Sequence, residues 1–243
     1  MRWATFLTYL SIFTPVLTQD SGQGIFLECK QPGLFALTFD DGPGPFTSKL
    51  LKIFLERNVK ATLFVLGVNI RNSQHVSQLK EAYAQGHQIA LHTDSHPHLN
   101  TLSVNEIASE MKANEQAVEM AIGVRPNYMR PPYGECNDNT RLALLSLDYT
   151  VVNWNVDSQD WQYRGNPSEQ WKILANIATE VQNKPYISGS YISLQHDTDA
   201  SSVNATTNII DLVLSKGYKL VTVAECLGNQ LRFYKRKFTN ESN

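Results

Sequence analysis

Two adjacent carboxylates, Asp40 and Asp41, stand where an apolar run at residues 34–37 gives way to a Gly-Pro break. Such a run is typical of a buried strand, and successive strand side chains point to opposite faces. We therefore expect Asp40 and Asp41 to have different tasks at the strand end. One would hold a cation and the other would handle a proton, and the spacing alone allows either assignment.

Two histidines, His92 and His96, follow another apolar run at residues 87–91. Histidines four positions apart can face one cation if the segment after the strand turns helically. One carboxylate and two imidazoles leave open positions on a zinc-like ion, which is typical of a hydrolytic site. The pair alone also fits two surface histidines, and the Asp pair at another strand end favours the metal site. His98 follows Pro97, and we interpret it as a loop residue.

Three further polar clusters each follow an apolar run: Arg130-Pro131-Pro132-Tyr133-Gly134, Asp157-Ser158-Gln159-Asp160-Trp161 and Leu194-Gln195-His196-Asp197. Two prolines hold the first cluster extended, so that Arg130 can orient a carboxylate and the Tyr133 amide can point into a site. Each cluster alone also fits an ordinary turn or a surface residue. Five polar clusters at successive strand ends are better explained by one shared site.

The elements that must position these clusters alternate along the chain. Strands are predicted up to residue 40 and over residues 62–66, 87–91, 127–129, 150–154, 190–194 and 219–223, and helices over 47–58, 73–85, 103–121, 138–147, 167–182 and 201–216. Thr47 or Ser48 is expected to cap the first helix. This α/β pattern indicates a parallel sheet covered by helices, and favours a closed or incomplete (β/α) barrel over an open doubly wound sheet. In both folds, chemistry belongs at the C-terminal strand ends.

Composition fits one globular domain. The chain has 243 residues, 42% of them hydrophobic and 18% charged. Its net charge of −2 gives no reason to expect nucleic acid or an anionic membrane surface as a partner. No repeat or low-complexity linker divides the chain. We expect a single domain over residues 20–243, with a core at about 34–223, and a monomer.

The N-terminus has the pattern of a secretory signal peptide. Met1-Arg2 is a short basic start, residues 6–17 are mostly apolar, and polar residues follow. The apolar run is too short to span a bilayer, and neither a later segment nor the polar C-terminus has the pattern of a membrane anchor. We expect residues 1–19 to be removed and the protein to be secreted, outside the cell or in the cell wall. A buried N-terminal helix is the alternative.

Secretion favours a disulfide between Cys29, before the first strand, and Cys226, after the last. In the chain-entropy model, a bridge that closes so long a loop contributes roughly 4–5 kcal/mol. Cys136 is then left as a buried free thiol or as a partner of another chain. Asn204 and Asn240 each begin a glycosylation sequon.

The five clusters together resemble the motifs of the polysaccharide deacetylase family (the NodB-homology domain, carbohydrate esterase family 4). Thr38-Phe39-Asp40-Asp41-Gly42-Pro43, His92-Thr93-Asp94-Ser95-His96 and the three later clusters occur in the family's order within residues 34–223. The resemblance implies a distorted, incomplete (β/α) barrel of NodB type, which agrees with the pattern of elements. Family members often have Trp where Asp94 stands.

The resemblance implies that Asp41, His92 and His96 hold one divalent metal ion. Zinc suits two imidazoles and a carboxylate, and cobalt or nickel also fit. Asp40 would then be the general base, and Arg130 would orient it.

For the rest of the site, the resemblance implies that the Tyr133 amide helps to hold the oxyanion. His196 would be the general acid, tuned by a carboxylate, for which we favour Asp160 over Asp157. Leu194 and Trp161 would wall the pocket for the acetyl methyl group.

The implied activity is removal of N-acetyl groups from N-acetylglucosamine units of chitin or chito-oligosaccharides. Peptidoglycan N-acetylglucosamine deacetylation and acetylxylan ester hydrolysis are alternatives that need the same machinery. An inactive carbohydrate-binding module is a different class of protein, and we expect such a module to have lost the base, a ligand or the acid. This sequence keeps all of them.

Overall fold

A computed structural model of the chain describes residues 24–229 and 233–235. The predicted signal peptide and Asn240 lie outside the described residues. The strands are β1 Ile25–Phe26, β2 Leu34–Ala36, β3 Thr38–Gly42, β4 Thr62–Val65, β5 Gln88–Leu91, β6 Tyr128–Met129, β7 Thr150–Val152, β8 Val156–Asp157, β9 Tyr191–Leu194 and β10 Lys219–Val221. The α-helices are α1 Thr47–Arg57, α2 Gly67–Ile70, α3 Ser73–Ala84, α4 Val104–Ile122, α5 Asp138–Ser146, α6 Trp171–Asn183, α7 Ala200–Ser215 and α8 Val223–Cys226, and short 3₁₀ helices are η1 Leu99–Thr101, η2 Pro132–Gly134 and η3 Asp160–Tyr163.

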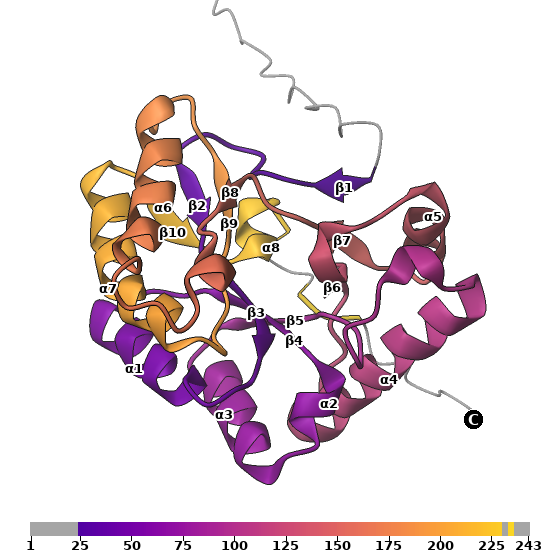
Figure 1. Cartoon of the computed structure of the whole chain (residues 1–243). Helices are drawn as coiled ribbons and strands as arrows, with labels where there is room; N and C mark the ends of the chain where they lie inside the picture. Colours follow the sequence, from indigo (N-terminus) through magenta and orange to yellow (C-terminus); the bar gives the residue numbers. More distant parts are fainter. Residues whose placement is uncertain (1–23, 230–232, 236–243) are drawn as a thin grey trace, which may run out of the picture.

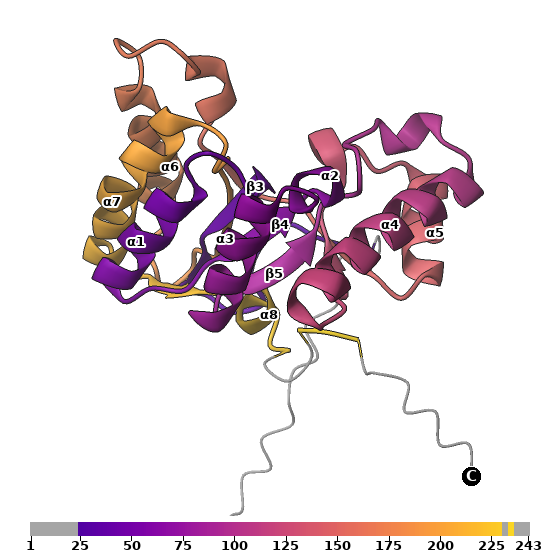
Figure 2. The same ribbon diagram turned by 90° about the horizontal axis from the view of Figure 1, so that it is seen from below.

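The strands form two parallel sheets that curve into an incomplete barrel. One sheet has the order β1-β7-β6-β5-β4-β3 and the other the order β10-β2-β9-β8. In the described part of the chain, the sheets meet through an isolated bridge between Asp40 and His196, where the Asp40 N–H donates to the Gln195 carbonyl at 2.8 Å. Helices α6 and α7 lie side by side on one flank, and α4 and α5 on the other (Figures 1 and 2). The predicted fold class, a single mixed α/β domain of distorted (β/α) barrel type, is confirmed.

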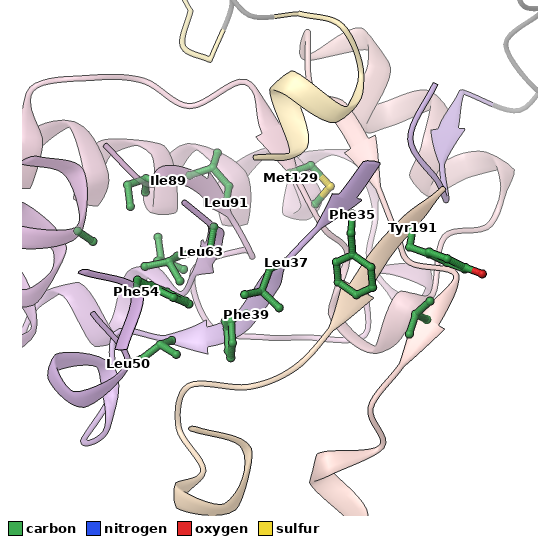
Figure 3. Packing of buried hydrophobic residues seen from close by; sticks show 14 of the residues in the cluster. Phe35, Leu37, Phe39, Leu50, Phe54, Leu63, Ile89, Leu91, Met129 and Tyr191 are labelled. Atoms are coloured by element: carbon green, nitrogen blue, oxygen red, sulfur yellow. The ribbon is translucent and has the colours of Figure 1, made fainter. Parts of the chain in front are cut away.

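Side-chain alternation along the strands divides the core into two layers. In β2 and β3, Phe35 and Phe39 belong to the outer layer, between strands and helices, while Ala36 belongs to an inner layer inside the barrel. Phe39 packs against Phe54 of α1 with ring centroids 5.6 Å apart (Figure 3). The other members of the inner layer include Phe64, Ala90, Tyr128, Val152, Ile192 and Val221. Seven strands, β2, β4, β5, β6, β7, β9 and β10, thus each present a residue to the inner layer.

The first predicted strand is in fact two strands in different sheets. β2 pairs with β9 and β10, whereas β3 pairs with β4. Leu37 lies between them, and its carbonyl accepts a hydrogen bond from the Thr62 N–H at 3.0 Å. The chain turns the corner from one sheet to the other at this residue, which a continuous apolar run does not reveal.

Three predictions about the ends of helices and strands are wrong. Helix α1 has no side-chain cap, because the Thr47 hydroxyl accepts from the Gly44 N–H at 2.7 Å and donates to Asp197. Helix α6 begins at Trp171, not at residue 167. The last strand ends at residue 221 because Thr222 forms a capping box with Glu225 and starts α8.

The Cys29–Cys226 disulfide is present, with 197 residues of sequence separation. Both sulfurs are buried beneath the inner layer of the core, and they tie α8 to the segment before β2. Cys136 is free and half-buried, and burial raises the pKa of its thiol to about 11. No helix in the described residues is long and apolar enough to cross a membrane.

The disulfide is expected to stabilise the fold by about 2–5 kcal/mol. Cys29→Ala/Cys226→Ala should lower the free energy of unfolding by that amount, because it releases a closed loop of most of the domain. Urea denaturation followed by circular dichroism measures the change. Cys136→Ser is the matched control, and a double variant as stable as this control would contradict the assignment.

Candidate functional site

The candidate site is built on the inner faces of the strands, next to the inner core layer on the side of the C-terminal strand ends. Asp40 lies four residues after Ala36, and Arg130 lies two residues after Tyr128, so both continue the inward-facing rows. His92 and Leu194 follow Ala90 and Ile192 by two in the same way. The C-terminal strand ends therefore direct four of the predicted site residues into one space.

Asp41 reaches the same space because β3 contains a bulge. Asp40 pairs with Phe64 and Gly42 with Val65, which leaves Asp41 as the extra residue, with φ at 71°. The Asn69 side chain donates to the Asp41 carbonyl at 2.6 Å and holds this conformation. The expectation that neighbouring strand residues face opposite sides is wrong here, since the bulge turns Asp41 toward the histidines.

Asp41, His92 and His96 form a cluster with the donor set of a metal site. Their ligand atoms lie within 4.8 Å of one another. The buried Asp41 Oδ1 has no hydrogen-bond partner in the described residues, and it lies 3.5 Å from His92 Nε2 and 3.4 Å from His96 Nε2. Ligand atoms that each lie about 2.0–2.2 Å from one tetrahedral ion are about 3.4 Å from one another, which matches these two separations. The three residues therefore fit a divalent ion.

The ligands are prepared for a cation by their surroundings. His92 Nδ1 lies 2.7 Å from the Arg130 carbonyl, which can only accept, so Nδ1 donates this hydrogen bond and Nε2 is the ring atom that faces Asp41. Burial opposes ionisation of Asp41, but its imidazole neighbours, His92 first, hold the pKa of that carboxyl well below its usual value. Burial, helped by the charge of His92, also lowers the pKa of His96. Asp41 is thus ionised and His96 tends toward the neutral form, as ligands must be.

Asp40 is held by a buried ion pair. Arg130 Nη1 lies 2.7 Å from Asp40 Oδ1, and both side chains are almost completely buried. Asp40 Oδ2 is 3.9 Å from His92 Nε2. Arg130 therefore fixes one oxygen of Asp40 and leaves the other facing the metal cluster.

His196 is held by Asp160 through two contacts. The His196 backbone N–H donates to Asp160 Oδ2, and its Nδ1 to Asp160 Oδ1, both at 2.7 Å. Burial alone would lower the pKa of His196, but the Asp160 hydrogen bond and charge prevail and raise it to about 9. Asp157 instead accepts from the Gln159 N–H at 2.7 Å, and burial raises its pKa. The structure thus brings Asp160, and not Asp157, into hydrogen-bond contact with the His196 ring.

One cavity of about 620 Å³ is lined by Asp40, Asp41, His92, His96, Asp157 and His196. Leu194 is nearly buried in its wall, while Tyr133 and Trp161 are each 53% exposed at its edge. Trp154 and Arg164 also line it, and neither was predicted from the sequence. Trp154 lies two residues after the inward-facing Val152, so the strand alternation could have indicated it. Arg164 follows η3 and carries no comparable signal.

His98 lies in a loop, as predicted, and its side chain also makes specific contacts. Its ring stacks on Tyr133 with centroids 4.0 Å apart and planes at 13°. Its Nδ1 lies 3.1 Å from Glu135 Oε2. The edge of the cavity at Tyr133 is therefore braced from behind by a second ring.

The sequence profile of one family, described as polysaccharide deacetylase, matches residues 28–152. The chain belongs to the polysaccharide deacetylase family. Enzymes of this family are metal-dependent hydrolases, which agrees with the cluster of Asp41, His92 and His96.

Its relatives include fungal and bacterial deacetylases. The chain is 39% identical to a chitin deacetylase of Colletotrichum lindemuthianum over 207 residues, which are 84% of this chain and 83% of the relative. The solved structure of the chitin deacetylase from that fungus superposes with a TM-score of 0.84 at 38% identity, over 87% of this chain and 96% of the other. The Bc1960 peptidoglycan N-acetylglucosamine deacetylase superposes with a TM-score of 0.75 at 30% identity, over 85% and 94%.

Asp160→Asn should lower the pKa of His196 from about 9 toward its ordinary value of about 6.5, because only the charges of Asp40 and Asp41 then oppose the effect of burial. In the wild type, the raised pKa stabilises the fold fully below pH ~6.5, and this contribution is lost as pH rises through about 9. The imidazole NMR titration of the metal-free protein measures the shift. Asp157→Asn is the matched control, and an equal shift in both variants would refute the role of Asp160.

Proposed function

We propose that this protein is a secreted, metal-dependent hydrolase that removes N-acetyl groups from N-acetylglucosamine units of chitin or chito-oligosaccharides. The observation that carries the proposal is that three groups of residues meet around one cavity. They are the Asp41, His92 and His96 cluster, the Asp40–Arg130 pair and the His196–Asp160 pair, whose Asp40 and His196 line the cavity. The similarity to a chitin deacetylase over most of both chains supports chitin as the substrate. The disulfide supports secretion.

The residues that would hold the metal ion are Asp41, His92 and His96. Zinc is the preferred ion for this donor set, with cobalt and nickel as alternatives. When bound, a divalent ion supplies Lewis-acid polarisation of the acetyl carbonyl and lowers the pKa of water from ~15.7 to ~7.

Asp40 would accept the proton of the attacking water. Its Oδ1 is committed to Arg130 at 2.7 Å, so Oδ2 is the basic atom that remains. The Tyr133 N–H would donate to the oxyanion of the tetrahedral intermediate. Tyr133 has φ at 61°, and its placement between His96 and His98 keeps this strained backbone at the cavity edge.

His196 would donate a proton to the nitrogen that leaves with the sugar, since an amine leaves poorly unless it is protonated. With a pKa of about 9 the imidazolium is populated at neutral pH. Its Nδ1 is bound to Asp160, so Nε2 is the donating atom. Leu194 and Trp161 would enclose the acetyl methyl group, and the two half-exposed rings at the cavity edge suit the apolar faces of sugars.

Acetate release from chitin oligomers, peptidoglycan and acetylxylan tests the proposal directly. The purified protein with zinc should release acetate fastest from the chitin oligomers, and chelator treatment should stop the release until a divalent ion is restored. Faster release from peptidoglycan or from acetylxylan would replace chitin with that substrate. No release from any of the three would refute the proposed activity.

Asp40→Asn and Asp41→Asn should separate the tasks of the two carboxylates. Asp40→Asn should bind zinc as the wild type does but lose about 10²–10⁴-fold in kcat, because the general base is gone. Asp41→Asn should lose zinc affinity as well. Isothermal titration with zinc and acetate release measure the two effects. An active Asp40→Asn variant, or one that no longer binds zinc, would show that the roles are assigned wrongly.

A further inference from the structure

The segment that carries His96, residues 92–96, is held in a conformation that its sequence does not favour. We call it the His loop. Thr93 has φ at 69° and His96 has φ at 64°, both in the left-handed region. A β-branched residue such as Thr is rarely found there, and such conformations persist only when the surrounding structure imposes them. The segment between His92 and His96 is therefore not a helical turn, and another constraint must place His96.

That constraint comes from helix α4. Glu110 Oε2 accepts from the backbone N–H groups of Asp94 at 3.0 Å and Ser95 at 2.9 Å, and Oε1 accepts from the Ser95 hydroxyl at 2.8 Å. One turn later, the buried Asn114 side chain donates to the Thr93 carbonyl at 2.5 Å. Charged acceptors make the stronger class of hydrogen bond. The carboxylate of Glu110 thus holds two successive amides at the tip of the loop.

An ion pair supports the other side of the loop. Arg71 Nη2 lies 2.7 and 2.8 Å from the two carboxylate oxygens of Asp94. A Cβ atom at Gly67 would come within 2.1 Å of Asp94 Oδ1, so the glycine leaves the space in which Asp94 lies. This chain therefore uses a partly exposed charge pair at Asp94 to fix the loop.

The other two ligands have supports of their own. His92 is fixed by the Arg130 carbonyl, and Asp41 by Asn69. In the described residues, the polar contacts of His96 apart from Asp41 all involve its backbone: its N–H donates to Thr93 Oγ1, and its carbonyl accepts from Tyr133. The imidazole of His96 is thus placed through the backbone of the His loop, together with the edge-on Tyr133 ring, whose centroid is 4.6 Å away.

We propose that Glu110 is a positioning residue of the metal site, which sets the place of His96 through the His loop, with the Arg71–Asp94 pair as a second support. The proposal rests on the metal site of the proposed function, but not on any substrate. In this proposal, the position of the ligand His96 is set from helix α4, which itself contributes no metal ligand.

The zinc dissociation constant, measured on the metal-free protein by competition with a chromophoric chelator, tests the proposal. Glu110→Ala should raise it by about 10–100-fold, the usual cost of losing a group that orients a ligand. Glu110→Gln, which keeps an acceptor oxygen, should restore most of the affinity. Glu119→Ala is the matched control on the same helix, where Glu119 pairs with Arg125 at 2.7 Å, and its constant should not change.

Arg71→Ala should weaken zinc binding less than Glu110→Ala. The Arg71 side chain is 56% exposed, so added salt should weaken the support that it gives the wild type. Salt should therefore change the zinc affinity of the wild type more than that of Arg71→Ala. An identical salt dependence in both proteins would overturn the role of the ion pair.

Val118→Ala separates positioning from simple loss of stability. Val118 is fully buried on α4, so its truncation should lower the melting temperature while leaving the zinc constant unchanged. Glu110→Leu, which keeps side-chain size, replaces Glu110→Ala if the alanine variant does not fold. The proposal would be overturned if Glu110→Ala or Glu110→Leu folds and binds zinc as tightly as the wild type. It would also be overturned if Val118→Ala loses as much zinc affinity as these variants do. Because no turnover is measured, failure of the chitin assignment would leave this result intact.

Discussion

The buried ion pair between Arg130 and Asp40 constrains the whole interior of the barrel. The Arg130 guanidinium also donates to Thr38 Oγ1 at 2.8 Å and to the Asn153 carbonyl at 3.2 Å, and its face lies 4.2 Å from the centre of the Phe64 ring. The free energy of removing two charges from water can exceed the free energy of their attraction, so such a pair is weak evidence for stability. What it does provide is a fixed direction for Asp40, because its donors tie β3, β6 and the end of β7 to one centre.

Strand alternation explains how much of the site could be predicted from the sequence. The inward rows Ala36–Asp40, Ala90–His92 and Tyr128–Arg130 follow from period-two patterning, and the polar clusters at the strand ends follow from the parallel topology. The bulge at Asp41 could not be predicted, because a single extra residue leaves the hydrophobic pattern unchanged. Its position depends on the Asn69 contact and on the approach of Asp197 to Gly42, both of which join distant parts of the chain.

Other features of the fold were not predicted because the local sequence pattern carries too little information about them. β1, β8 and α2 have two to four residues each, which is too short for a periodic signal. Thr47 has the residue type of a helix cap, but its hydroxyl is engaged with Asp197, the residue after His196. The tertiary contact with Asp197 thus replaces the local capping preference, and through it the start of α1 supports the loop that carries the proposed acid. Such conflicts between local propensity and tertiary contacts are expected beside functional sites.

Backbone strain is concentrated around the cavity. In the described residues, seven non-glycine residues have positive φ, and five of them, Asp41, Thr93, His96, Tyr133 and Gln159, belong to the clusters that form the site. Conformations of this kind cost about 1–3 kcal/mol each and persist only where other contacts impose them. For Asp41, Thr93 and His96 the contacts come from side chains that line no part of the cavity. Asn69 holds the Asp41 carbonyl, and Glu110 and Asn114 hold the His loop. The geometry of the site therefore depends on polar residues that lie behind the cavity. A substitution among these residues can abolish function even when every motif residue that lines the cavity is kept.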